Sequence, residues 1–115
     1  MDIVVLHDPR SPTSRKVLEL LEEEGHEPVL LDYLREPPSP EELRTILRLM
    51  EVGPRRIMRT KEPLYRRLGL DDPTLSEGQL LEAMSANPGL IDGPIVVTED
   101  QAVLARPAEK VFNVL

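Results

Sequence analysis

A chain of 115 residues is long enough for one compact domain but too short for two, and its formal net charge of −7 argues against general nucleic-acid binding, which normally needs a basic face. The lack of cysteine excludes disulfides and thiolate metal sites, and the presence of only two histidines argues against structural zinc. No apolar run is long enough to span a membrane and no signal-peptide pattern begins the chain, so we expect a cytoplasmic protein without membrane or nucleic-acid partners.

The first third of the chain predicts a β-α-β unit. Residues 2–6 form a short apolar run typical of a buried strand. Residues 13–24 carry an apolar stripe at helical spacing, and Gly25 is expected to stop this helix. A second strand is expected at 28–31. Because the whole unit is so short, its two strands are predicted to be parallel with a right-handed crossover.

Capping signals mark two helices in the middle of the chain. Ser39 followed by Glu42 is typical of a capping box, and Gly53 is expected to stop the helix that begins there. A second signal begins at Ser76, and its helix is expected to end before Asn87.

The remaining elements are short. They are expected as helical pieces at 54–59 and 62–68 and as strands at 95–97 and 102–104. The two strands predict a hairpin, and a last helix is expected to start at Pro107. The resulting order, β-α-β, a helical insertion over about 39–87 and then β-β-α, predicts a single α/β domain over residues 1–115 with a mixed four-stranded sheet.

The loop over residues 7–15, between the first strand and the first helix, is the candidate functional segment. A helix N-terminus directs several free backbone N–H groups and the positive end of the helix dipole at one point, which favours anion binding. Thr13 and Ser14 carry hydroxyls that either cap the helix or bind an oxyanion, and we expect at least one of them to cap it. Pro12 removes one N–H from this cradle. Read without further context, Ser11 is a small polar residue that satisfies a turn beside the helix start.

Blocks along almost the whole chain resemble the glutaredoxin-coupled, ArsC-type arsenate reductases. The signature loop of that family, roughly His-Asn-Pro-x-Cys-x-x-Ser-Arg, matches residues 7–15 with Ser11 at the cysteine position. The other matching blocks are Glu36-Pro37-Pro38, Met58-Arg59-Thr60-Lys61-Glu62, Leu64-Tyr65-Arg66-Arg67-Leu68-Gly69-Leu70, Pro94-Ile95-Val96-Val97 and Arg106-Pro107. The resemblance implies a thioredoxin-like (glutaredoxin-type) fold and reduction of arsenate to arsenite. It also implies glutathione as co-substrate and glutaredoxin as partner, with no bound cofactor or metal.

The same resemblance assigns roles within the loop. In the family, the cysteine at the position of Ser11 is the nucleophile, and His7 matches a histidine that holds this thiol in its reactive form. Arg15 matches the loop arginine, which pairs with the anion. Because a hydroxyl cannot supply a thiolate, we expect the chain as written to be inactive. The sequence leaves open whether Ser11 is natural or was introduced to trap a ligand-bound state.

Three arginines clamp the oxyanion in the family, and this chain keeps two of them. Arg59 and Arg106 match, but Gly93 stands at the third position. Asp8 replaces the usual asparagine and places a negative charge beside the loop. Pro94 stands at the position of the proline that is cis in thioredoxin-like proteins, so its peptide bond is expected to be cis.

A non-enzymatic function is the alternative. Transcriptional regulators of the Spx type share this fold and bind RNA polymerase, usually with a Cys-x-x-Cys redox switch in the same loop. The absence of cysteine excludes a redox-sensing version here. A constitutive protein-binding function remains open.

Overall fold

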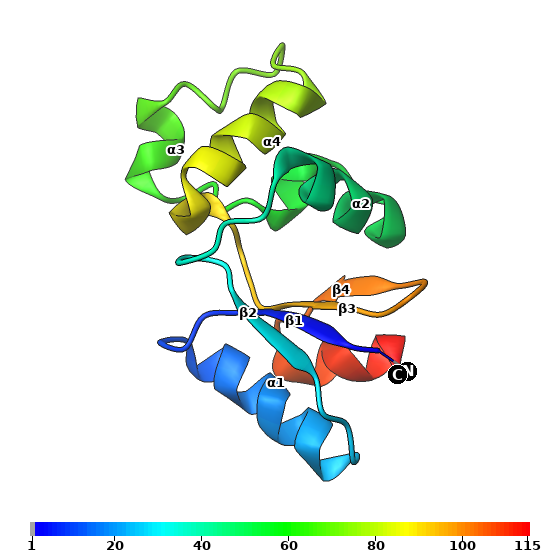
Figure 1. The fold of residues 1–115 in the computed structure, drawn as a ribbon. Coiled ribbons are helices and arrows are strands. Elements are labelled where there is room, and N and C mark those ends of the chain that lie inside the picture. Colours follow the sequence, from blue (N-terminus) through cyan, green and yellow to red (C-terminus); the bar gives the residue numbers. More distant parts are fainter. Residues whose placement is uncertain (1) are drawn as a thin grey trace. The chain divides into compact units, whose positions relative to one another are not determined.

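The computed structural model describes residues 2–115, which divide into two compact units (Figure 1). The first unit contains the residues up to Glu36 together with Gly93–Leu115, and the second contains Pro37–Asp92. The helical insertion expected at about 39–87 falls within the second unit. No helix in the described part of the chain is long and apolar enough to cross a membrane.

The first unit is built on a four-stranded mixed sheet, as predicted. Its strands are β1 (Val4–His7), β2 (Val29–Asp32), β3 (Ile95–Val97) and β4 (Ala102–Leu104), in the order β2-β1-β3-β4. The pair β1–β2 is parallel, as expected for the β-α-β unit, whereas β1–β3 and the β3–β4 hairpin are antiparallel. The parallel register places His7 opposite Asp32, at the end of β1 that leads into the candidate loop.

Two helical elements cover the same side of this sheet and enclose its core (Figure 1). Helix α1 spans Pro12–Glu23, and the 3-10 helix η3 spans Ala108–Val114 and packs against it. The core residues are all apolar and come from the sheet and from these two elements: Ile3, Val5, Val17, Leu20, Leu21, Val96, Ala105, Ala108, Val111 and Val114. Gly25, at φ 81°, takes the left-handed conformation that ends α1 where the sequence predicted.

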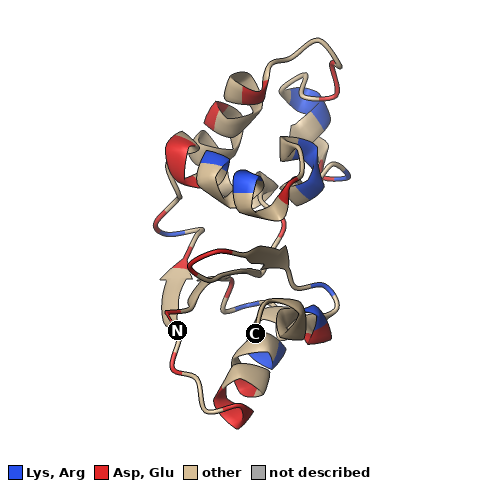
Figure 2. Ribbon diagram, turned by 90° about the vertical axis from the view of Figure 1, so that its right-hand side faces the viewer, with Lys and Arg blue, Asp and Glu red and all other residues tan. Residues whose placement is uncertain are grey.

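The second unit is entirely helical apart from an isolated bridge between Met58 and Ile91. Its elements are α2 (Pro40–Met50), η1 (Pro54–Ile57), α3 (Pro63–Arg67), α4 (Glu77–Ala86) and η2 (Pro88–Leu90). The capping boxes at Ser39 and Ser76 are both present, which confirms the two predicted helix starts. Figure 2 shows basic residues on α2, η1 and α3 within this unit.

The predicted end of α2 is wrong. The helix ends with Glu51 in the left-handed region at φ 57°, whereas Gly53 lies outside that region and caps η1. Elsewhere the backbone follows the expectation, because the Gly93–Pro94 peptide is cis. The Arg106–Pro107 peptide is also cis, which the sequence did not predict. Together, the order of elements and the sheet topology give the thioredoxin-like arrangement expected from the resemblance.

Candidate functional site

Ser11 is the N-cap of α1. Its backbone is extended, at φ −87° and ψ 122°, and its Oγ accepts a hydrogen bond from the N–H of Ser14 at 3.3 Å. The expectation that Thr13 or Ser14 would cap the helix is therefore wrong, because the cap is Ser11 itself. The hydroxyl is thus directed at the helix N-terminus, where the dipole favours negative charge.

The backbone amides of this helix start are mostly engaged already. The N–H of Ser11 donates to the Asp8 carbonyl at 3.0 Å, and that of Arg15 donates to the Ser11 carbonyl at 3.1 Å. Pro12 has no N–H, and the N–H of Ser14 is bonded to the cap. Among residues 11–15, all of which the structure describes, only Thr13 keeps an N–H without a protein acceptor. The helix start therefore offers one free backbone N–H to an anion, whereas the sequence predicted several.

The side chains after the cap fold back on the loop. Ser14 is fully buried, and its Oγ accepts a hydrogen bond from the N–H of Asp8 at 3.1 Å, so this hydroxyl braces the loop. The exposed Arg15 donates from Nη1 to the Pro9 carbonyl at 3.0 Å. Both residues thus hold the loop in place in this structure, whereas the resemblance assigns them to the oxyanion.

Arg106 brings a positive charge to the same helix start. Its Nε donates to the carbonyl of Gly93, and its Nη1 lies 3.5 Å from Thr13 Oγ1. The guanidinium is thereby held beside the residue whose amide has no protein acceptor. A fixed guanidinium and a helix N-terminus are a combination suited to an oxyanion.

Asp8 places a negative charge in the same loop. Its carboxylate accepts hydrogen bonds from the Arg10 backbone N–H at 2.9 Å and from Arg10 Nε at 3.3 Å. Partial burial raises the pKa of Asp8, but these hydrogen bonds and the charge of Arg10 outweigh it and hold the pKa below its ordinary value. Asp8 is therefore ionised at neutral pH, and its charge opposes a bound anion.

His7 is buried at the end of β1, with 9% of its surface exposed. Its Nδ1 is shielded from solvent and has no hydrogen-bond partner among residues 2–115. A buried polar atom without a partner is uncommon in folded proteins. At least one ring nitrogen of His7, Nδ1, is therefore buried without a hydrogen bond.

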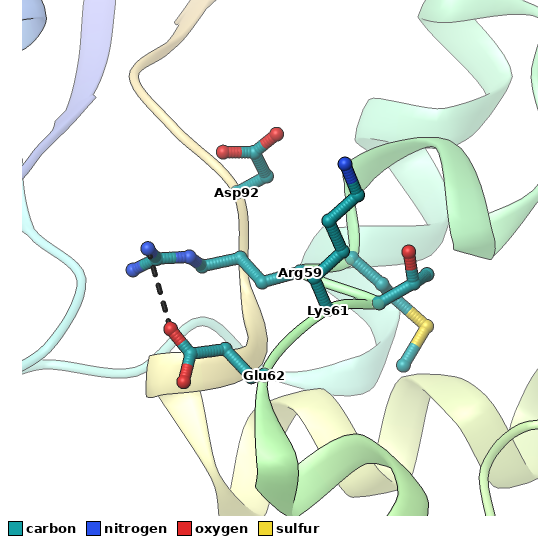
Figure 3. A pocket seen from close by; sticks show the side chains of 6 residues that line it. Arg59, Lys61, Glu62 and Asp92 are labelled. Atoms are coloured by element: carbon teal, nitrogen blue, oxygen red, sulfur yellow. Dashed lines mark ion pairs between the residues drawn. The ribbon is translucent and has the colours of Figure 1, made fainter.

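Arg59 belongs to the second unit and has its own surroundings there. Its Nη2 lies 3.3 Å from Glu62 Oε1, in an open pocket also lined by Met58, Thr60, Lys61 and Asp92. Figure 3 shows Arg59 extended toward Glu62, whereas the Lys61 amine turns away from that pair. Of the predicted site residues, the structure therefore groups His7, Ser11, Thr13, Ser14, Arg15 and Arg106 in the first unit and pairs Arg59 with Glu62 in the second.

Tyr33 and Glu62 contact the predicted site residues, although neither was predicted from the sequence alone. A Cβ atom added to Gly93 would lie 3.0 Å from the Tyr33 phenol, and no local pattern relates residues so far apart. The pairing of Arg59 with Glu62 did have a signal, because opposite charges three residues apart often pair. Among residues 2–115, no group of three His, Asp or Glu side chains comes together to hold a metal ion.

The chain is similar to known proteins along almost its whole length. A sequence model of the ArsC family matches residues 6–114. The chain is 40% identical over 98% of its length to Escherichia coli YfgD, an uncharacterized protein, of which it covers 96%. It is 38% identical over its whole length to a protein named arsenate reductase from Haemophilus influenzae, all of which it covers. The solved structure of an arsenate reductase from Vibrio cholerae superimposes with a TM-score of 0.96 at 41% identity, covering 100% of this chain and 98% of that one.

Proposed function

Because the chain belongs to the ArsC family, we propose that it binds a tetrahedral oxyanion of the arsenate class at the Ser11 loop and does not reduce it. The observation that carries this proposal is that Ser11 Oγ caps α1. The resemblance of the loop to the family signature assigns the reactive cysteine to this same residue. The cap retains the geometry of the helix start. It cannot retain the chemistry of a thiol.

The redox step requires sulfur at this position. Conversion of As(V) to As(III) takes two electrons, which two thiols supply when they become a disulfide. A serine oxygen cannot be a member of that pair, and its hydroxyl is not ionised at neutral pH. Glutathione and glutaredoxin, the family's electron donors, therefore have no protein sulfur to reduce in this chain. The proposal keeps the cytoplasm as the location, because the glutathione chemistry of the family belongs to that compartment.

Binding is supported by the groups at the start of α1. The free N–H of Thr13, the helix dipole and the guanidinium of Arg106 all provide positive potential at one point. The charge of Asp8 works against them. We therefore expect weak oxyanion binding, carried mainly by Arg106 because a guanidinium makes charge-assisted hydrogen bonds.

The test measures binding and turnover separately. Sulfate is the probe for binding, because it is tetrahedral and is not reduced by glutathione; the measurement is the NMR shift of the Thr13 amide during titration. Arg106→Gln is expected to weaken this titration about tenfold. Lys110→Gln, which removes the same charge from an exposed residue of η3, is the matched control and is expected to leave the titration unchanged.

Turnover is measured as arsenite formed with glutathione and glutaredoxin. The unmodified chain is expected to form none, and Ser11→Cys is expected to form it. Arsenite production by the unmodified chain would refute the proposal. Equal sulfate titrations for the Arg106 and Lys110 variants would show that the Ser11 loop is not the anion site.

A further inference from the structure

Three arginines of η1 and α3 are exposed and lack an acidic partner. Arg56 lies on η1, and Arg66 and Arg67 form the last turn of α3. Within residues 2–115, none of them lies in an ion pair, although acidic residues outnumber lysines and arginines by 21 to 14. Acidic side chains are thus plentiful, and the fold leaves these three arginines without one.

Arg55 fixes the two elements that carry these arginines against each other. Its Nε donates to the hydroxyl of the buried Tyr65 on α3 at 2.9 Å. Its Nη2 donates to the carbonyls of Leu70 and Asp72, at 3.0 and 2.7 Å, in the segment after α3. Arg55 therefore has a structural function, and it makes η1 and α3 neighbours, as Figure 2 also shows. A surface fixed in this way loses little conformational entropy when a partner binds.

An exposed apolar residue follows α3 directly. Leu68 follows Arg67 directly and is 46% exposed. Within residues 37–92, it is the one large apolar side chain that is strongly exposed. We use the term basic surface for Arg56, Arg66, Arg67 and Leu68. Arginine beside an exposed apolar residue is the composition typical of protein interfaces.

We propose that the basic surface docks an acidic protein segment that also presents an apolar side chain. The charge of the arginines requires an acidic partner, and Leu68 requires an apolar contact, which a phosphate backbone does not offer. The net charge of −7 and the neighbouring Asp71 and Asp72 repel any anionic partner, and they repel a long polyanion such as a nucleic acid more strongly than a segment with few acidic residues. A short acidic segment with one apolar residue meets these conditions.

The helix dipole does not account for the whole surface. Basic residues near a helix C-terminus are stabilising, and this applies to Arg66 and Arg67. However, α3 has five residues, so its dipole is small. The dipole of α3 also gives no reason for the arginine on η1 or for an exposed leucine.

The experiment uses the full chain and a fluorescein-labelled peptide rich in glutamate with a central leucine. Fluorescence anisotropy measures its affinity for the wild type and for Arg66→Glu/Arg67→Glu, and we expect the double reversal to weaken binding about tenfold or more. Lys16→Glu/Lys110→Glu makes the same change in net charge on exposed residues of the first unit and is expected to bind like the wild type. Arg56→Glu and Leu68→Ala, each measured alone, test the other members of the surface. Circular dichroism confirms that each variant is folded.

Three results would overturn the proposal. An equal loss of peptide affinity in Arg66→Glu/Arg67→Glu and in Lys16→Glu/Lys110→Glu would mean that only the net charge of the protein matters. Tighter binding of a single-stranded oligonucleotide of equal charge than of the peptide would assign the surface to nucleic acid. A concentration-dependent dimer in sedimentation, abolished by Arg66→Glu/Arg67→Glu, would show that a second copy covers it.

Discussion

A Cβ atom added to Gly93 would lie 3.0 Å from the phenol oxygen of Tyr33 and 3.0 Å from its Cε1. Tyr33 is buried, with 4% of its surface exposed. The carbonyl of the same glycine accepts a hydrogen bond from Arg106. Gly93 is thus held between an aromatic ring and a guanidinium. Any side chain at this position must displace the Tyr33 ring by a few tenths of an ångström.

The tight contact makes Gly93→Ala a destabilising substitution. Because the added methyl meets a buried ring, we expect the free energy of unfolding to fall by about 1–2 kcal/mol. Gly89→Ala is the matched control, since an added Cβ there meets nothing within 4 Å. The free energy of unfolding of this control should fall by less than about 0.5 kcal/mol. Urea denaturation followed by circular dichroism measures both values, and an equal change in the two variants would mean that Tyr33 does not restrict position 93.

An arginine at position 93 should strengthen arsenate binding in a variant that carries a thiol at position 11. In a Ser11→Cys background, we expect Gly93→Arg to lower the KM for arsenate about tenfold, because a guanidinium adds charge-assisted donors. Gly89→Arg in the same background adds the same charge elsewhere and should leave the KM unchanged. The assay is arsenite formation with glutathione and glutaredoxin. An unchanged KM in a variant that remains folded would mean that a side chain from position 93 does not reach the anion.

The cap at Ser11 contributes to stability independently of any ligand. Ser11→Ala removes the acceptor for the Ser14 N–H and should lower the free energy of unfolding by about 1 kcal/mol. Ser11→Asp keeps a capping oxygen and should retain most of the stability. Ser39→Ala, which breaks the capping box of α2, provides a reference value in the second unit. Equal unfolding free energies for the alanine variant and the wild type would show that the cap at position 11 is not significant.

Local rules explain why so many elements could be predicted from the sequence. A capping box involves residues three positions apart, so Ser39 and Ser76 could be identified without knowledge of the fold. The parallel β1–β2 pair follows from the short crossover between them. The end of α2 could not be predicted, because Glu51 takes a left-handed conformation that favours glycine, and nothing nearby in the sequence signals it.

The site was harder to predict because its contacts are long-range. The sequence located the Ser11 loop, but the number of free amides depends on which carbonyls and hydroxyls the folded loop brings near them. Tyr33 and Gly93 are far apart along the chain and meet only in the folded first unit. The same holds for Arg106 and Thr13. Sequence pattern therefore identifies the element that carries a site, and the tertiary fold sets its hydrogen bonds.

The hydrogen bonds from Arg10 to Asp8 make stability depend on pH. Since the pKa of Asp8 is lower in the folded protein, its contribution is fully present above the unfolded pKa, about 3.9, and is lost as the pH falls through the folded value. We expect Asp8→Asn to lose less stability than the wild type when the pH is lowered below about 4. Asp71→Asn, at an exposed residue, is the control. Unfolding free energies measured in urea at several pH values test this prediction. The same dependence of stability on pH in the wild type and in Asp8→Asn would contradict it.

Among the cationic side chains of the second unit, Arg55 should contribute most to stability. Arg55→Ala leaves the buried Tyr65 hydroxyl and two carbonyls without their donor, so we expect the free energy of unfolding to fall by about 2–3 kcal/mol. Arg55→Lys should not restore it, because one ammonium group cannot reproduce the fork of a guanidinium. Arg56→Ala, at the exposed neighbour, should change stability by less than about 0.5 kcal/mol. Urea denaturation gives these values, and hydrogen exchange of the α3 amides localises the loss. If the two alanine variants were equally stable, Arg55 would not hold η1 against α3.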